Sequence, residues 1–172
     1  MTAYVALLRG VNLAGNSTLR MADLKAIADD LGLDRPRTFI ASGNLLFASG
    51  KSEEELRLML AKKLREHMGK DVGVMLRTAA EMAAVVRANP FADVPPKSVQ
   101  AIFLNAPPPA ELLDTLRNQD DERIAAGVRE VFVAYGEKGI GRSRLRIPAA
   151  EAGTARNMNT VAKLAALARE LT

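Results

Sequence analysis

The chain has 172 residues, 48% of them hydrophobic, and its 24 Lys and Arg exceed its 20 Asp and Glu by four charges. This composition leaves ample material for a core, and the absence of cysteine excludes disulfides, thiolate nucleophiles and zinc-thiolate sites. No stretch approaches the roughly 18 apolar residues of a membrane span, and no basic leader precedes the first apolar run. We therefore expect a cytoplasmic protein without a membrane partner, whose mild positive charge permits an anionic one.

The first half of the chain alternates strand and helix patterns. Continuous apolar runs of strand length, helical spacing of leucines and glycine stops predict the order β-α-β-β-α-β. Ser52 and Glu55 have the spacing of a capping box at the start of the second helix. The predicted elements are strand 3–8, helix 21–31, a hairpin of 38–41 and 45–48, helix 52–69, strand 72–77 and helix 79–88.

The second half repeats this order approximately after a proline-rich joint, residues 89–96. Its predicted elements are strand 99–104, helix 107–116, a short strand 122–126, strand 130–135 and helix 157–171. The order within each half is typical of split βαβ units. We therefore predict an α+β fold of two tandem ferredoxin-like halves packed as one compact unit, with residues 1–88 in the first half and 97–172, including the C-terminal helix, in the second.

Two polar blocks follow predicted strands of the first half. Arg9-Gly10-Val11-Asn12 ends the first strand and leads into a loop with Gly15, Asn16 and Ser17; its arginine and amide groups suit a phosphate or carboxylate, but a glycine-dependent bend explains it as well. Ser42-Gly43-Asn44 has the composition of a tight hairpin turn, which is the simpler interpretation. In such a sheet the two blocks need not be neighbours.

A third polar block, Thr154 to Thr160, precedes the C-terminal helix. Thr154 or Asn157 can cap that helix, and its free backbone amides suit an anion. Arg156 is unexpected at the positive end of a helix dipole, which favours a bound anion or a carboxylate elsewhere in the fold.

The segment from Gly136 to Arg146 contains three glycines and four cations, which suits contact with nucleic acid. Its Gly-x-x-Gly sequence follows a predicted strand, whereas the RNA-binding KH loop joins two helices, and no Walker pattern is present. A solvated basic hairpin is the simpler interpretation. His67 and the acidic run Asp120-Asp121-Glu122 show no catalytic or metal-ligand spacing, so we expect no metal and no cofactor.

Taken with their order and spacing, these blocks resemble a bacterial family known as domain of unknown function 1697. The matching segments are Ala6–Asn12 with Met21 and Leu24, Thr38–Asn44, Asn89-Pro90-Phe91, and Thr154–Asn157 with Asn159 and Thr160. The resemblance implies a duplicated ferredoxin-like α+β architecture. It implies no activity, since the family has none established.

The leading hypothesis is a binding protein whose cleft holds a phosphate-bearing or carboxylate-bearing ligand. A rival hypothesis is weak, salt-sensitive nucleic-acid binding by the basic loop. A third is an enzyme of unknown reaction, although no general base is identifiable from the sequence. The residues predicted to bind the small ligand are Arg9, Asn12, Asn44, Arg156, Asn157 and Asn159. Those predicted to contact nucleic acid are Lys138, Arg142, Arg144 and Arg146.

Overall fold

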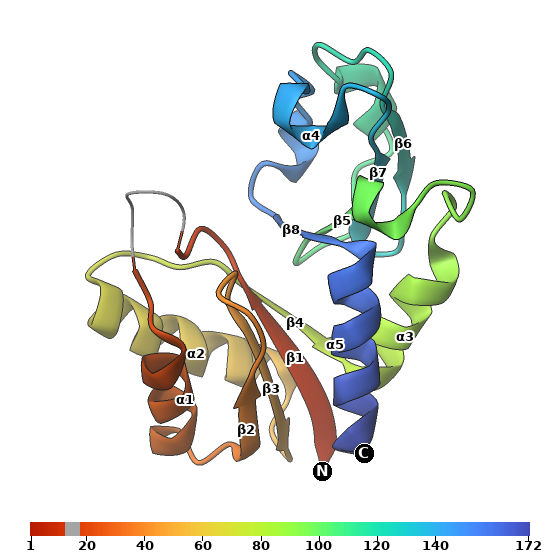
Figure 1. The fold of residues 1–172 in the computed structure, drawn as a ribbon. Coiled ribbons are helices and arrows are strands. Elements are labelled where there is room, and N and C mark those ends of the chain that lie inside the picture. The colour runs from red at the N-terminus through yellow and green to blue at the C-terminus, as the bar shows by residue number, and fades with distance from the viewer. Residues whose placement is uncertain (13–17) are drawn as a thin grey trace. The chain divides into compact units, whose positions relative to one another are not determined.

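The computed structural model describes residues 1–12 and 18–172, which form two units, each built on a four-stranded antiparallel sheet (Figure 1). Met1–Ala83 together with Leu164–Thr172 form the first unit, and Ala84–Lys163 form the second. The predicted loop residues Gly15, Asn16 and Ser17 lie outside the described residues. The α+β class predicted from the sequence is confirmed.

The first unit places its two most apolar strands at the centre of the sheet. The strand order is β2-β3-β1-β4, in which β1 pairs antiparallel with both β3 and β4. Strands buried on both faces are expected to be continuously hydrophobic, as β1 is over residues 3–8 and β3 is over residues 45–48. The elements are β1 (Thr2–Leu8), α1 (Met21–Asp30), β2 (Asp34–Thr38), β3 (Asn44–Ser49), α2 (Glu53–Met68), β4 (Val74–Thr78) and α3 (Ala79–Ala88).

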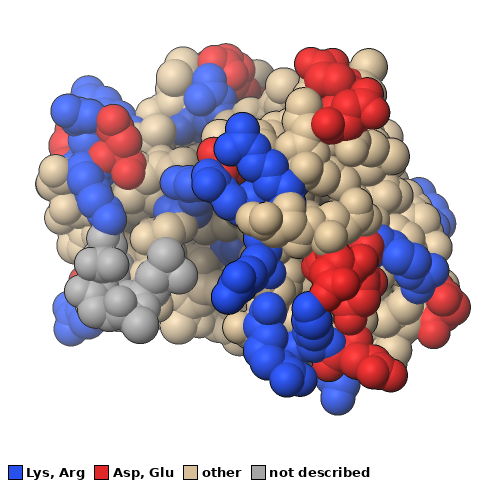
Figure 2. Space-filling model, turned by 90° about the horizontal axis from the view of Figure 1, so that it is seen from above, with Lys and Arg blue, Asp and Glu red and all other residues tan. Residues whose placement is uncertain are grey.

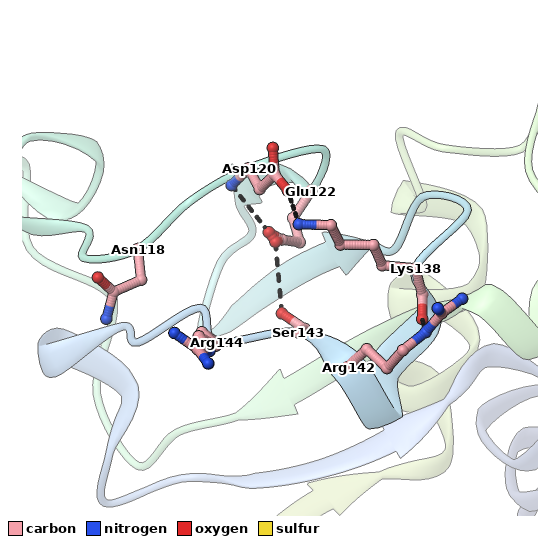
Figure 3. Close-up of a pocket in the computed structure, with 7 residues that line it drawn as sticks. All are labelled: Asn118, Asp120, Glu122, Lys138, Arg142, Ser143 and Arg144. Atoms are coloured by element: carbon pink, nitrogen blue, oxygen red, sulfur yellow. Dashed lines mark hydrogen bonds and ion pairs between the residues drawn. The ribbon is translucent and has the colours of Figure 1, made fainter.

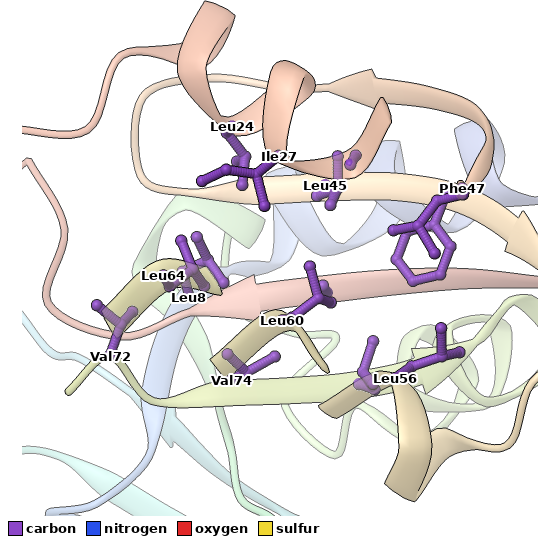
Figure 4. Packing of buried hydrophobic residues seen from close by; sticks show 14 of the residues in the cluster. Leu8, Leu24, Ile27, Leu45, Phe47, Leu56, Leu60, Leu64, Val72 and Val74 are labelled. Atoms are coloured by element: carbon purple, nitrogen blue, oxygen red, sulfur yellow. The ribbon is translucent and has the colours of Figure 1, made fainter. Parts of the chain in front are cut away.

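The helices α1 and α2 bury their apolar faces on one side of this sheet (Figure 4). Leu24 of α1 and Leu60 of α2 are fully buried with Phe47 of β3. The predicted capping box at the start of α2 is confirmed, because the Ser52 hydroxyl accepts a hydrogen bond from the Glu55 backbone and Glu55 bonds back to Ser52. These contacts fix where α2 begins and which face it buries.

The end of the C-terminal helix α5 (Met158–Glu170) belongs to the first unit. Two arginines of β2 hold it there: Arg35 Nη2 donates to the Leu171 carbonyl at 3.1 Å, and Arg37 pairs with Glu170 at 3.2 Å. The sequence predicts that this whole helix lies in the second half, whereas the two units divide it after Lys163. The contacts that hold its end in the first unit join residues more than 130 positions apart, and such contacts leave no local signal in a sequence.

The second unit has the strand order β6-β7-β5-β8, with the first strand again between the third and the fourth. The helices that lie wholly within this unit span only three or four residues each. The predicted helix 107–116 is wrong over most of its length, since only Leu112–Thr115 are helical and form a 3₁₀ turn after three prolines. The elements are β5 (Val99–Phe103), β6 (Arg123–Ala126), β7 (Glu130–Ala134), α4 (Gly139–Arg142), β8 (Thr154–Asn157) and 3₁₀ helices at Pro96–Ser98, Leu112–Thr115 and Pro148–Ala150.

The helices of the described residues include none with the length and apolar composition needed to cross a bilayer.

Candidate functional site

A pocket of about 390 Å³ lies in the second unit, between the turn that precedes β6 and the loop that follows β7 (Figure 3). In this view Asn118 and Arg144 lie on one side of Ser143, and Lys138 and Arg142 lie on the other. The residues that line it are Asn118, Asp120, Glu122, Lys138, Arg142, Ser143 and Arg144.

The two loops that line this pocket pack closely against each other. A methyl group on Gly136 would stand 2.2 Å from the Asp121 carboxylate, so a larger residue there would require the Asp121 side chain to move. Glu122 is 4% exposed, and its Oε1 accepts a hydrogen bond from the Asp120 backbone at 3.0 Å. Its Oε2 accepts a hydrogen bond from the Ser143 hydroxyl at 3.3 Å. The carboxylate therefore joins one loop to the other.

The cations around the pocket differ in how they are engaged. Lys138 forms an ion pair with Asp120, and Arg142 donates from Nε to the Lys138 carbonyl at 3.3 Å. Arg144 and Asn118 form no side-chain hydrogen bond or ion pair with any residue in the ranges 1–12 and 18–172. Two polar side chains with donors to spare therefore face the same pocket.

Two pKa shifts reflect the charges of this loop pair. The hydrogen bond to Asp120, with the charge of that carboxylate, raises the pKa of the Lys138 ammonium group. Burial, together with the negative charge of Glu122, raises the pKa of the Tyr135 hydroxyl. Both groups therefore keep their protons well above neutral pH.

The basic loop predicted from the sequence contributes three of its four cations to this pocket, namely Lys138, Arg142 and Arg144. Arg146 instead pairs with Glu151 at 2.8 Å, and its backbone exchanges two hydrogen bonds with Arg117. The acidic run is only partly solvated, because Asp120 and Asp121 are exposed whereas Glu122 is buried. Opposite charge in the two loops was visible in the sequence, but nothing in it showed that these loops meet.

The first two polar blocks meet in the first unit. The Asn12 amide donates to the Leu19 carbonyl at 2.8 Å and to the Ala41 carbonyl at 2.7 Å, and its oxygen accepts from the Leu19 backbone at 2.6 Å. Asn12 has a φ of 56°, a left-handed conformation that asparagine tolerates. Its side chain therefore ties the loop after β1 to the turn before β3.

The predicted hairpin differs from a two-residue turn. Residues 39–43 connect β2 to β3, and Asn44 is the first residue of β3 and fully buried. Its amide donates to the Phe39 carbonyl at 2.9 Å and to the Ser42 hydroxyl at 3.1 Å, so it holds the turn closed. Arg9, which is exposed, donates its backbone N–H to Gly73 at 2.9 Å.

The third polar block forms the strand β8 and the N-terminal cap of α5. Thr154–Asn157 form β8, so Arg156 lies in a strand, directly before the residue that caps α5. Arg156 is 6% exposed, with Nη1 donating to the Thr154 hydroxyl at 2.7 Å and to the Ala155 carbonyl at 2.9 Å. Burial lowers the pKa of its guanidinium to about 10. Asn157 caps α5 as one alternative predicted, accepting from the Thr160 backbone at 3.0 Å, and Asn159 is exposed.

Comparison with known proteins supplies a family for this fold. Residues 1–132 match the model of a protein of unknown function, DUF1697. The chain belongs to this family. The match confirms the resemblance carried by the polar blocks of the first half, and the family brings no established activity.

A solved structure shares the fold. It is the conserved bacterial protein SP0830 from Streptococcus pneumoniae, with a TM-score of 0.77 and 22% sequence identity, over 97% of this chain and 98% of that one. At this identity the likeness shows the fold alone. No curated protein sequence matches the chain.

Proposed function

We propose that the second unit binds a small anionic ligand, bearing a phosphate or a carboxylate, in the pocket beside Asn118 and Arg144. One observation carries this proposal: these two side chains line the pocket without a partner among the described residues, whereas the other polar side chains there are engaged by the protein itself. A guanidinium offers a planar pair of donors that matches a carboxylate or phosphate, and an amide can orient the bound group.

The shape of the site favours a small molecule over a polymer. A concave volume of about 390 Å³ lies within the range of small-ligand pockets. Nucleic-acid binding would need unneutralised cations along a surface, but Lys138 and Arg146 are paired with carboxylates. Figure 2 shows basic side chains beside acidic ones in several groups on the face it views. Nucleic-acid binding through this loop is therefore the second candidate.

The cleft residues predicted from the sequence stay a prediction. Four of them already have a structural role, since Asn12, Asn44 and Arg156 bond to neighbouring backbone and Asn157 caps a helix. A ligand at these residues would compete with contacts that hold the fold. The geometry therefore favours the pocket of the second unit.

Calorimetric titration tests the proposal with pyrophosphate as the phosphate-bearing probe and citrate as the carboxylate-bearing one. Arg144→Gln removes the charge, so the affinity for the bound probe should fall about tenfold or more. Arg146→Gln is the matched control, because this arginine lies two residues away and pairs with Glu151; its affinity should match that of the wild type.

Equal losses in both variants would point to general charge attraction and count against the pocket. Salt-sensitive binding of a mixed-sequence oligonucleotide, without binding of either small probe, would replace the proposal with its rival.

We also propose that the two units are duplicated ferredoxin-like halves. The equivalent strand order of the two sheets supports this, since β2-β3-β1-β4 and β6-β7-β5-β8 both place the first strand between the third and the fourth. Superposing the sheets strand by strand tests it: matching strand directions and register would support duplication, and a shifted register would oppose it.

A further inference from the structure

Ser143 lines the pocket and follows α4 directly, between Arg142 and Arg144 in the sequence (Figure 3). Its hydroxyl donates to Glu122 Oε2 at 3.3 Å and accepts a hydrogen bond from the Leu145 backbone at 3.2 Å. A hydroxyl oxygen has two lone pairs, so one remains available to a ligand in the pocket. The hydrogen bonds orient this hydroxyl but do not use up its capacity to react.

Glu122 has the surroundings expected of a base. Its carboxylate is nearly excluded from solvent, no described cation forms an ion pair with it, and it contacts the Ser143 hydroxyl directly. A serine is a weak nucleophile until an adjacent base takes its proton. Long hydrogen bonds between such groups are common in unliganded sites and shorten when a substrate binds.

We propose that Ser143 is a nucleophile that accepts a phosphoryl group from an activated phosphate, such as an acyl phosphate or phosphoanhydride, with Glu122 as its base. This inference rests on the anion pocket proposed above. The Ser143 oxygen forms a bond to phosphorus while the bond from phosphorus to the leaving oxygen breaks. The hydroxyl proton passes to Glu122 Oε2, and the leaving group departs as a carboxylate or phosphate.

The residues beside Ser143 fit a phosphoryl group in particular. Arg144 has no partner among the residues described and lies next to Ser143, where its guanidinium can hold two phosphoryl oxygens. Asn118 offers two further donors on the same side of the pocket. Catalysis of phosphoryl transfer depends mainly on such positioning and on charge stabilisation.

A purely structural role is the alternative, in which Glu122 and Ser143 only fasten the two loops together. Glu122→Gln separates the two roles. The amide oxygen of glutamine can keep the Ser143 hydrogen bond if its NH2 group turns toward the Asp120 backbone, at the expense of that second hydrogen bond, but it cannot take the proton. A fastening role predicts unchanged reactivity in this variant, whereas a base predicts a large loss.

The experiment incubates the full chain with acetyl phosphate and measures intact mass, with peptide mapping to locate the modified residue. We expect one phosphoryl group on Ser143, none on this peptide in Ser143→Ala, and about a hundredfold slower labelling in Glu122→Gln. Ser98→Ala, which removes a serine distant in sequence, is the control and should label at the wild-type rate. The affinity of Glu122→Gln for pyrophosphate should be no lower than that of the wild type, because the substitution removes a negative charge from the lining of the pocket.

Different failures overturn different proposals. If pyrophosphate binds the wild type but Ser143 gains no phosphoryl group, the nucleophile is wrong and the pocket stands. If Ser143 gains an acetyl group, or if Glu122→Gln labels at the wild-type rate, the phosphoryl acceptor or the base is wrong. If neither pyrophosphate nor citrate binds, the anion pocket itself fails.

Discussion

The two units share a strand order but use the polar residues beside their strands differently. In the first unit the side-chain amides of Asn12 and Asn44 donate hydrogen bonds to backbone carbonyls, and these bonds hold the turn beside β1 closed. In the second unit Glu122 and Ser143 join two loops, while Arg144 is left facing a pocket. Polar loops of similar appearance in a sequence can therefore have side chains that hold the fold closed or side chains that are left facing a pocket, and the hydrogen-bond partners distinguish the two.

The largest expected effect lies in the closed turn of the first unit. Gly43 has a φ of 90°, and a methyl group there would stand 2.6 Å from Val11 Cγ2 and 3.0 Å from Leu8 Cβ. Gly43→Ala should lower the free energy of unfolding by about 2 to 4 kcal/mol, through backbone strain and overpacking. Urea unfolding measures this loss.

Gly50→Ala is the control for that prediction. Its methyl group would meet nothing within 4 Å, so stability should change by less than about 0.5 kcal/mol. Equal stability of both variants would mean that the turn is not tightly closed.

A smaller loss of stability is expected in the second unit. A methyl group on Gly136 would stand 2.2 Å from a carboxylate oxygen of Asp121, which is an exposed side chain and can move. Gly136→Ala should cost about 1 to 2 kcal/mol in urea unfolding, less than Gly43→Ala. It should also weaken pyrophosphate binding, because the loops around the pocket must shift.

Gly141→Ala provides the comparison for Gly136→Ala, since Gly141 lies in α4 with open space around it. We expect wild-type stability and affinity. A cost in Gly136→Ala as large as that in Gly43→Ala would show that the second unit is as tightly closed as the first.

The smallest effect concerns the start of α2, where the first unit has a capped helix. Ser52→Ala should cost about 1 kcal/mol, as the loss of a capping hydroxyl usually does. Thermal unfolding measures it, and Ser98→Ala serves as the control. An unchanged melting temperature in Ser52→Ala would mean that α2 depends on packing alone.

The contribution of the Ser52–Glu55 capping box to stability depends on pH. Hydrogen bonds from the Ser52 backbone and hydroxyl lower the pKa of the Glu55 carboxyl in the folded chain. Its contribution to stability is therefore present above the usual pKa of glutamate and is lost as the pH falls through the lowered value. The difference in stability between the wild type and Glu55→Gln should shrink from pH 7 to pH 3, and a difference that stays constant would contradict this.

Sequence reasoning succeeded for α2 and for the central strands. Continuous apolar runs and a serine three residues before a glutamate are local signals, and both led to the observed elements. The capping residues before α5 indicated the start of that helix correctly, but they gave no sign that Thr154–Asn157 form the strand β8. Pairing with β5 decides that strand, and β5 lies more than 50 residues away in the sequence.

The features of the candidate site also fall into those visible in the sequence and those visible only in the structure. The basic composition of residues 138–146 was plain from the sequence, and so was the family resemblance. The burial of Glu122, its hydrogen bond to Ser143 and the position of Arg144 at a pocket depend on two loops that meet in space. Periodicity and capping are read over a few residues, so they determine elements. Which side chains are left with spare donors depends on contacts between distant segments, and only the folded chain decides that.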